Sequence, residues 1–179
     1  MDFDLIKRAY NFAKQKHSGQ KRDGGKEYIT HPVNVAKLVI KYKPSHNLDI
    51  LIAGALLHDT LEDTYTSYKE LIDNFGEIIA SLVMELTTAG YVPKLEGKEV
   101  YLSKKMQDMS NYALAIKLAD RLDNVSDLKT TTVEKRERII LQTRYILNYL
   151  KQNRELTDCQ KNLVELIENE IKNYETGEN

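Results

Sequence analysis

Two adjacent residues at the end of an apolar run are the first that could do chemistry. The segment "ALLHDTLEDT", residues 55–64, ends with His58 and Asp59, and a second acidic pair, Glu62 and Asp63, follows at once. The leucines before the histidine belong in a core, so His58 and Asp59 are expected at the buried end of that segment. Burying a charge is unfavourable unless it is paired or binds a metal ion. A metal site is therefore one explanation of this pattern.

A further histidine and a further carboxylate lie elsewhere in the chain. His31 precedes a proline at the expected start of a helix, and Asp120 lies inside the strongly apolar stretch "AIKLADRLDNVSDL". Asn124 and Asp127 follow Asp120 at helical spacing, on the side opposite a leucine stripe. A helix with leucines on one side and carboxylates among alanines on the other is expected to be buried on both. The alternative is a helix with one solvated face, and any single histidine could be a surface or core residue without a function.

Taken together, four of these residues resemble the ligand set of a transition metal. Two imidazoles and two carboxylates suit Mn²⁺, Fe²⁺ or Zn²⁺ better than Ca²⁺. Four protein ligands leave room on a six-coordinate ion for water and a substrate oxygen, so the ion can lower the pKa of that water and polarise a phosphoryl group. The expected ligands are His31, His58, Asp59 and Asp120.

The acidic pair after the His-Asp dipeptide could supply a general base. Glu62 would lie one helical turn beyond His58 if the helix continues, so its carboxylate could accept a proton from the attacking water. The alternative is a solvated charge at the end of a helix.

Basic residues in a polar loop could meet a phosphorylated substrate. Lys21, Arg22 and Lys26 surround a glycine pair in "HSGQKRDGGKEYIT", and such cations form charge-assisted hydrogen bonds with phosphates. A solvated basic loop is the alternative. Lys94 and Arg144 are further candidates for phosphate contacts.

Hydrophobic spacing is helical almost throughout, and no segment alternates convincingly with period two. We therefore expect a single all-α domain over residues 1–179, with a metal site between helices. In the first helix Phe3, Ile6, Tyr10 and Ala13 should face inward. A second helix is expected from Pro32, with Val35, Ala36, Val39 and Ile40 facing inward. A short helix is expected after Ser67 with an end at Gly76, and a longer one from a cap at Thr131 to about Asn153. The remaining helices are expected from Leu48 to about His58, from Ile78 to Leu86, from about Lys98 to Asp108, from Tyr112 to Leu128, and from Thr157 to about Lys172.

Composition limits the possible functions. The 179 residues are 41% hydrophobic and 30% charged, and 26 basic residues nearly balance 27 acidic ones, so no global field favours nucleic acid. The single cysteine, Cys159, cannot form an internal disulfide. The longest apolar run, from Ile50 to Leu57, is too short to cross a bilayer. We expect a cytoplasmic protein that binds neither nucleic acid nor membranes.

The ordered motifs resemble those of a known family. The stretches "HSGQKRDGGKEYITHPVNVAKLV", "AGALLHDTLEDT", "FGEIIASLVMELT" and "AIKLADRLDNVSDLK" occur in the order and spacing of the HD superfamily. More narrowly, they are similar to the hydrolase domain of RelA/SpoT-type alarmone enzymes and to the free-standing small alarmone hydrolases. The resemblance covers about residues 5–150, and the helices over 133–172 are expected to pack on this core. No stretch resembles a synthetase or regulatory domain, so we expect hydrolase activity alone.

The resemblance implies a 3′-pyrophosphohydrolase that converts guanosine tetra- or pentaphosphate to GDP or GTP plus pyrophosphate, usually with Mn²⁺. It assigns the metal to the same four residues that the chemistry selected. It also implies that Glu62 and Asp63 handle the attacking water, that Arg22 packs on the guanine, and that Asn124 faces the nucleotide.

Three residues depart from the family pattern. Asp23 stands where a basic or small residue is common, Glu27 replaces a proline, and Asp123 replaces a histidine or tyrosine. None belongs to the expected metal set, so they bear on substrate preference. One alternative is therefore an HD phosphohydrolase of another nucleotide, such as the 2′-phosphate of NADPH. Another is a catalytically silent HD module that binds a nucleotide or a protein, although a binding module has no need of the acidic pair.

Overall fold

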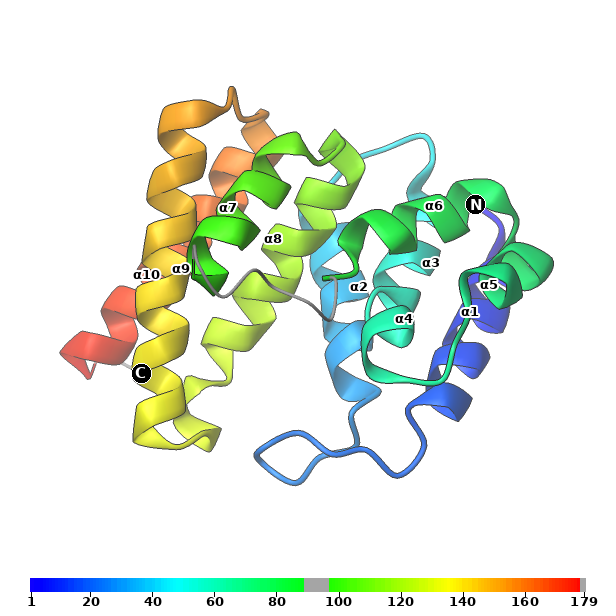
Figure 1. Ribbon diagram of the computed structural model, residues 1–179, viewed down its shortest axis with the longest axis horizontal. Coiled ribbons are helices and arrows are strands. Elements are labelled where there is room, and N and C mark those ends of the chain that lie inside the picture. Colours follow the sequence, from blue (N-terminus) through cyan, green and yellow to red (C-terminus); the bar gives the residue numbers. More distant parts are fainter. Residues whose placement is uncertain (89–96, 178–179) are drawn as a thin grey trace. The chain divides into compact units, whose positions relative to one another are not determined.

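The computed structural model describes residues 1–88 and 97–177, and all regular elements in these ranges are helices (Figure 1). Within them the only extended pairing is an isolated bridge between Lys21 and Glu27. The expected all-α class is thus confirmed. Internal contacts divide the chain into two compact units, Met1–Ala89 and Gly90–Asn179.

The first unit is built around one buried helix. α3 (Leu48–Leu57) is apolar apart from Asp49 in its first turn, and each of its residues from 51 to 57 is buried, as expected of a helix without a polar face. It packs against α1 (Phe3–Lys16), α2 (Thr30–Tyr42) and α6 (Glu77–Leu86). The short helices α4 (Thr60–Asp63) and α5 (Tyr68–Phe75) lie between α3 and α6 in the chain.

The inner face of α1 differs from the one predicted. Ala13 is buried as predicted, but Leu5 and Ala9 are the other buried residues, and Phe3 is 74% exposed. Both sets of residues have helical spacing, and the two alanines have the small side chains that allow close contact with α3. Of the face predicted for α2, Val35, Ala36 and Val39 are buried, but Ile40 is 51% exposed.

The second unit contains α7 (Lys98–Asp108), α8 (Asn111–Ser126), the 3₁₀ turn η1 (Leu128–Thr130), α9 (Val133–Asn153) and α10 (Asp158–Thr176). Within this unit α8 packs on α10, and α7 packs on α9. Every residue of α8 from 113 to 122 is buried, which confirms the prediction that this helix is covered on both sides.

Side-chain caps explain where several helices begin. Ser67 accepts a hydrogen bond from the Glu70 amide at the start of α5, as predicted. Thr157 and Gln160 form a capping box at the start of α10. The cap of α9 is Thr132, which accepts from the Lys135 amide, so the prediction of Thr131 was wrong by one residue.

No helix in the described ranges is long and apolar enough to cross a membrane. The single domain expected over residues 1–179 stays a prediction.

Candidate metal centre

Three buried residues of the first unit meet where its helices begin and end. His31 lies in the first turn of α2, His58 follows the last residue of α3, and Asp59 is the N-cap of α4. Their exposed fractions are 2%, 1% and 9%. α3 therefore delivers the His-Asp dipeptide into the interior, as the sequence predicted.

One carboxylate oxygen lies near both imidazoles. Asp59 Oδ2 is 3.0 Å from His58 Nε2 and 3.5 Å from His31 Nε2. Atoms bound to one ion at roughly 2.1 Å lie roughly 3.0 to 3.4 Å apart at octahedral to tetrahedral angles. The spacing of these three donor atoms thus fits a shared transition-metal ion.

The tautomer of His58 also suits a metal ligand. Its Nδ1 lies 2.8 Å from the carbonyl oxygen of Ala55, and because a carbonyl can only accept, Nδ1 must carry the hydrogen. In the neutral ring the Nε2 lone pair then faces the Asp59 carboxylate. Because the Nε2 atom of His58 and the carboxylate oxygen of Asp59 both carry lone pairs, a cation between them, either a proton or a metal ion, stabilises this contact. Such a hydrogen bond from the second ring nitrogen is usual for histidines that bind metals.

The acidic pair lies on α4, one turn beyond the dipeptide. α3 ends at Leu57, so the helix does not continue unbroken, but the Asp63 amide donates to the Asp59 carbonyl at 2.9 Å and preserves the helical spacing. Glu62 and Asp63 are both exposed. The Glu62 Oε2 atom accepts a hydrogen bond from the Thr88 amide at 2.8 Å.

In the second unit, Asp120 is held by residues of its own helix. Its Oδ2 atom lies 3.0 Å from the ammonium of Lys117, and Asn124 Nδ2 donates to its Oδ1 at 2.7 Å. Asp120 and Lys117 are 6% and 8% exposed. Both carboxylate oxygens therefore have a fixed direction. The neighbouring Arg121 is also buried, and burial lowers the pKa of its guanidinium while Asp120 opposes that shift.

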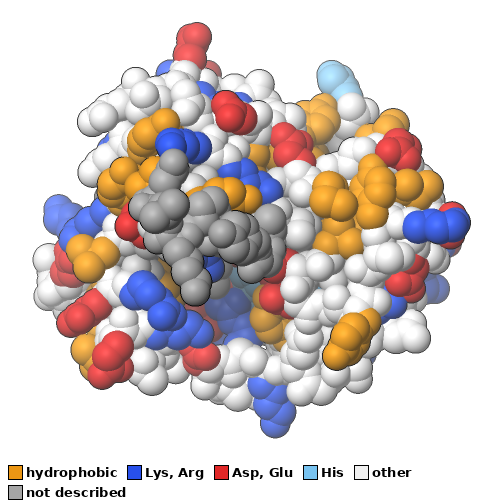
Figure 2. All heavy atoms as spheres, in the orientation of Figure 1, with side chains coloured by type: hydrophobic (Ala, Val, Ile, Leu, Met, Phe, Trp, Pro, Cys, Tyr) orange, Lys and Arg blue, Asp and Glu red, His pale blue; other side chains and the backbone are white. Residues whose placement is uncertain are grey.

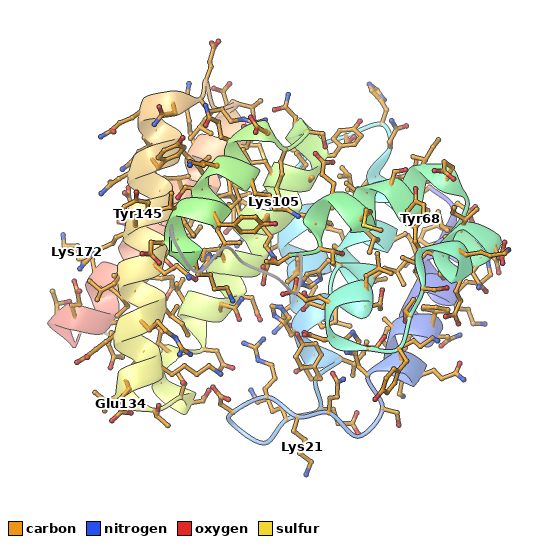
Figure 3. The ribbon with its side chains drawn as sticks, in the orientation of Figure 1. Lys21, Tyr68, Lys105, Glu134, Tyr145 and Lys172 are labelled. Carbon is orange, nitrogen blue, oxygen red and sulfur yellow. The ribbon has the colours of Figure 1, made fainter. Side chains whose placement is uncertain are left out.

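The expected phosphate-binding residues are spread over the surface. Lys21 and Lys26 are exposed, and Arg22 is half-buried. Figure 3 shows the Lys21 side chain extending away from the helices of its unit. Arg144 of α9 forms an ion pair with Glu175 of α10 at 2.6 Å, and Lys94 lies outside the described residues. The assignment of all the predicted site residues stays a prediction.

The described surface carries charges of both signs. Figure 2 shows basic and acidic side chains interspersed on the visible side of each unit, in keeping with the near balance of 26 and 27 such residues.

Sequence reasoning gave no role to several residues that contact the site. Tyr28 donates its hydroxyl to Asp59 Oδ2 at 2.6 Å, Gln20 reaches the backbone of Asp63, and Lys117 pairs with Asp120. The helical spacing of Lys117 three residues before Asp120 could have indicated that ion pair. The contacts of Tyr28 and Gln20 come from a loop, where no periodicity exists to reveal them.

Comparison with known protein families identifies the class of the chain. The model of the HD domain matches residues 9–155. The chain belongs to the HD-domain family, which confirms the resemblance noted in the sequence.

Individual relatives point to a narrower group. The chain is 44% identical over 140 residues to a guanosine-3′,5′-bis(diphosphate) 3′-pyrophosphohydrolase of Aquifex aeolicus, covering 77% of this chain but only 20% of that protein. It is 37% identical over 135 residues to the guanosine-3′,5′-bis(diphosphate) 3′-pyrophosphohydrolase MESH1 of Xenopus tropicalis, covering 74% of each. A solved structure described as a metazoan ortholog of SpoT that hydrolyzes ppGpp matches with a TM-score of 0.79 and 25% identity, covering 94% of this chain and 97% of that one.

Metal binding should be measurable without any substrate. Saturating Mn²⁺ at 100 times its Kd should stabilise the fold by about 2.7 kcal/mol, read as a rise in Tm. Asp59→Asn should remove most of this rise, because an amide is a weaker ligand than a carboxylate. Asp73→Asn, which alters an exposed ion pair with Lys69, should keep it. If none of Mn²⁺, Fe²⁺ and Zn²⁺ raises the Tm of the parent protein, the result would contradict a metal site.

Proposed function

We propose that the chain is a metal-dependent 3′-pyrophosphohydrolase of guanosine tetra- and pentaphosphate. The observation that carries this proposal is the acidic pair of α4, Glu62 and Asp63, one turn beyond a buried cluster of two histidines and an aspartate. The names of the relatives support the choice of substrate. The chain spans about 20% of the Aquifex relative, so the activity of that whole protein is not carried over.

One divalent ion is held by two imidazoles and two carboxylates. The distances and the histidine tautomer in the first unit support it, as does the fixed direction of the Asp120 carboxylate in the second. When bound, the ion polarises a phosphoryl oxygen and makes water a stronger nucleophile. The residues assigned to it are the four predicted from the sequence, His31, His58, Asp59 and Asp120.

Mn²⁺ is the preferred ion in this proposal, with Fe²⁺ or Zn²⁺ as substitutes. The set mixes nitrogen and oxygen donors and contains no thiolate, which suits Mn²⁺ and disfavours ions that require sulfur. We also place the protein in the cytoplasm, where a chain whose one cysteine forms no disulfide meets reducing conditions.

The reaction requires a base for water and a proton for the leaving oxygen. Glu62 takes a proton as the water oxygen bonds to the phosphorus attached to O3′. The bond between that phosphorus and O3′ breaks and pyrophosphate departs with the new oxygen, while O3′ takes a proton from solvent and Glu62 returns its proton to solvent. Asp63 helps to orient the water. The hydrogen bond from the Thr88 amide holds the Glu62 carboxylate in one direction, which favours proton transfer.

Basic side chains bind the nucleotide in this proposal. Arg22 packs on the guanine, Lys21 and Lys26 meet phosphates from the exposed loop, and Asn124 faces the nucleotide while its amide donates to Asp120. Lys94 and Arg144 are further phosphate ligands, the latter after giving up its pair with Glu175.

Product analysis tests the proposed reaction. With guanosine tetraphosphate and Mn²⁺ the products should be GDP and pyrophosphate in equal amounts, and oxygen-18 from labelled water should appear in the pyrophosphate. Orthophosphate released stepwise would indicate a phosphatase instead. Turnover of the 2′-phosphate of NADPH, with guanosine tetraphosphate untouched, would favour the alternative nucleotide, and no turnover of any nucleotide would favour a binding module.

The proposed base can be separated from the metal site. Glu62→Gln should lower kcat by about 10²- to 10⁴-fold, because an amide cannot take the proton from water. The Mn²⁺-dependent rise in Tm should persist in this variant. Glu77→Gln, at an exposed carboxylate of α6, serves as the matched control. A kcat unchanged by Glu62→Gln would remove this residue from the mechanism.

The unusual Asp23 should weaken substrate binding. It is exposed in the basic loop, where each charge contributes about 0.2 to 1 kcal/mol. Asp23→Lys should therefore lower KM for guanosine tetraphosphate by roughly two- to tenfold with little change in kcat, and added salt should reduce the gain. Asp73→Lys makes the same charge change on α5. If KM at low salt is unchanged by Asp23→Lys, that side chain does not face the substrate.

A further inference from the structure

A tyrosine hydroxyl lies between the two ends of α4. The Tyr28 hydroxyl oxygen is 2.6 Å from Asp59 Oδ2 and 3.1 Å from Asp63 Oδ2. Asp59 is the N-cap of this helix and Asp63 is its last residue. The hydroxyl therefore contacts both the carboxylate expected to bind the metal and the acidic pair expected to handle water.

The two contacts are unequal. A phenol has one hydrogen to donate, and a distance of 2.6 Å to Asp59 is typical of a charge-assisted O–H···O⁻ bond, whereas 3.1 Å to Asp63 is long for one. The hydrogen is thus given mainly to Asp59 Oδ2. This is the oxygen atom that faces the Nε2 atoms of both histidines, so the Tyr28 hydroxyl helps to fix the position of the Asp59 oxygen that is expected to bind the metal.

The ring of Tyr28 is held between two imidazoles. His17 lies against it with centroids 4.7 Å apart and planes tilted by 31°, and His31 meets it edge-on at 5.8 Å. Its backbone amide donates to the Gln20 carbonyl at 3.0 Å, and its carbonyl accepts from the His31 amide at 2.9 Å. Both the ring and the backbone of this residue are therefore fixed in place.

Gln20 holds the same end of α4 from the backbone side. Its Nε2 donates to the Asp63 carbonyl at 2.8 Å, which satisfies one of the carbonyls that a helix end leaves open. Because that carbonyl can only accept, the amide oxygen of Gln20 must face His17, and His17 Nδ1 donates to it at 2.8 Å. His17 is 3% exposed and Gln20 is half-buried, so a buried imidazole supports Gln20 and also lies against the ring of Tyr28.

We propose that Tyr28, supported by His17 and Gln20, is a positioning residue that keeps the acidic pair of α4 in a fixed relation to Asp59. A helix of four residues gains little stability from its own hydrogen bonds, so its geometry depends on such contacts. The effect on turnover rests on the proposed function, whereas the effect on α4 itself does not.

The first test uses hydrogen exchange on the metal-free chain. Tyr28→Phe keeps the ring and removes the hydroxyl, so amides of residues 60–64 should exchange about 5- to 10-fold faster, the expected loss for one hydrogen bond. The matched control is Tyr68→Phe. Tyr68, labelled in Figure 3, donates its hydroxyl hydrogen to Glu77 at 2.7 Å in the same unit. Removing this hydroxyl should leave the exchange rates of the amides of residues 60–64 unchanged. Equal exchange in Tyr28→Phe and the parent would overturn the proposal whether or not the chain is a hydrolase.

The second test uses kinetics at saturating Mn²⁺. Tyr28→Phe should lower kcat by about 10- to 100-fold, as loss of such supporting contacts commonly does, with KM changed less than about twofold because no substrate contact is lost. Full recovery of kcat in excess Mn²⁺ would reduce the role of Tyr28 to metal affinity and contradict the proposal. In an Asp63→Asn background the loss caused by Tyr28→Phe should shrink, since the two residues act together. Additive losses would contradict the coupling.

A second variant keeps the proposal testable if Tyr28→Phe proves unstable. Gln20→Met retains the length of the side chain and removes the donor to the Asp63 carbonyl. It should raise exchange over residues 60–64 and lower kcat in the same direction, whereas Gln107→Met, at a glutamine that bonds the Asn153 carbonyl in the second unit, should do neither. Unchanged exchange in Gln20→Met would remove the His17 and Gln20 support from the proposal.

Discussion

The first unit depends on keeping one carboxylate oxygen charged inside a helical core. Asp59 Oδ2 lies within 3.0 Å and 3.5 Å of two imidazole nitrogens and 2.6 Å of a phenol oxygen. Removing such a charge from water is unfavourable unless polar or cationic groups surround it. Three elements must therefore converge on this atom: the start of α2, the end of α3 and the loop before α2. α3, which is apolar apart from Asp49 in its first turn, anchors that convergence, and it ends at Leu57 so that the next two side chains reach the same point.

The same constraint explains why the expected chemistry lies on a short helix. α4 has four residues, too few for a helix to be stable alone. The helix is held instead from outside. The Gln20 amide donates to the Asp63 carbonyl, the Thr88 amide donates to the Glu62 carboxylate, and the Tyr28 hydroxyl lies 3.1 Å from the Asp63 carboxylate. Each contact comes from a segment distant in sequence. The position of the acidic pair is thus determined by the surrounding unit, and a local change in the loop before α2 affects α4 directly.

The sequence predicted the features that have a period or a cap. The apolar spacing predicted α3 and α8, and the Ser67 cap predicted the start of α5. It failed where two sets of residues had helical spacing, as in α1, where Leu5 and Ala9 face inward in place of the larger Phe3 that was predicted. The contacts of Tyr28 and Gln20 were not predicted, because a loop sequence has no periodicity that indicates which distant atoms its side chains will contact. The burial of His58 and Asp59 was predictable, but the tautomer that points Nε2 toward the carboxylate required the position of the Ala55 carbonyl.

The two buried aspartates are compensated in different ways, and this bears on how a divalent ion would bind. Asp120 has a lysine ammonium 3.0 Å away in its own helix, and Asp59 has an imidazole and a phenol among its neighbours. A nearby ammonium repels an incoming cation and partly neutralises the carboxylate that would attract it. Within the second unit, Lys117 thus weakens the attraction of Asp120 for a cation. Lys117 and Asn124 also set the direction of the Asp120 carboxylate in advance, so this side chain has little freedom left to lose when it binds a ligand.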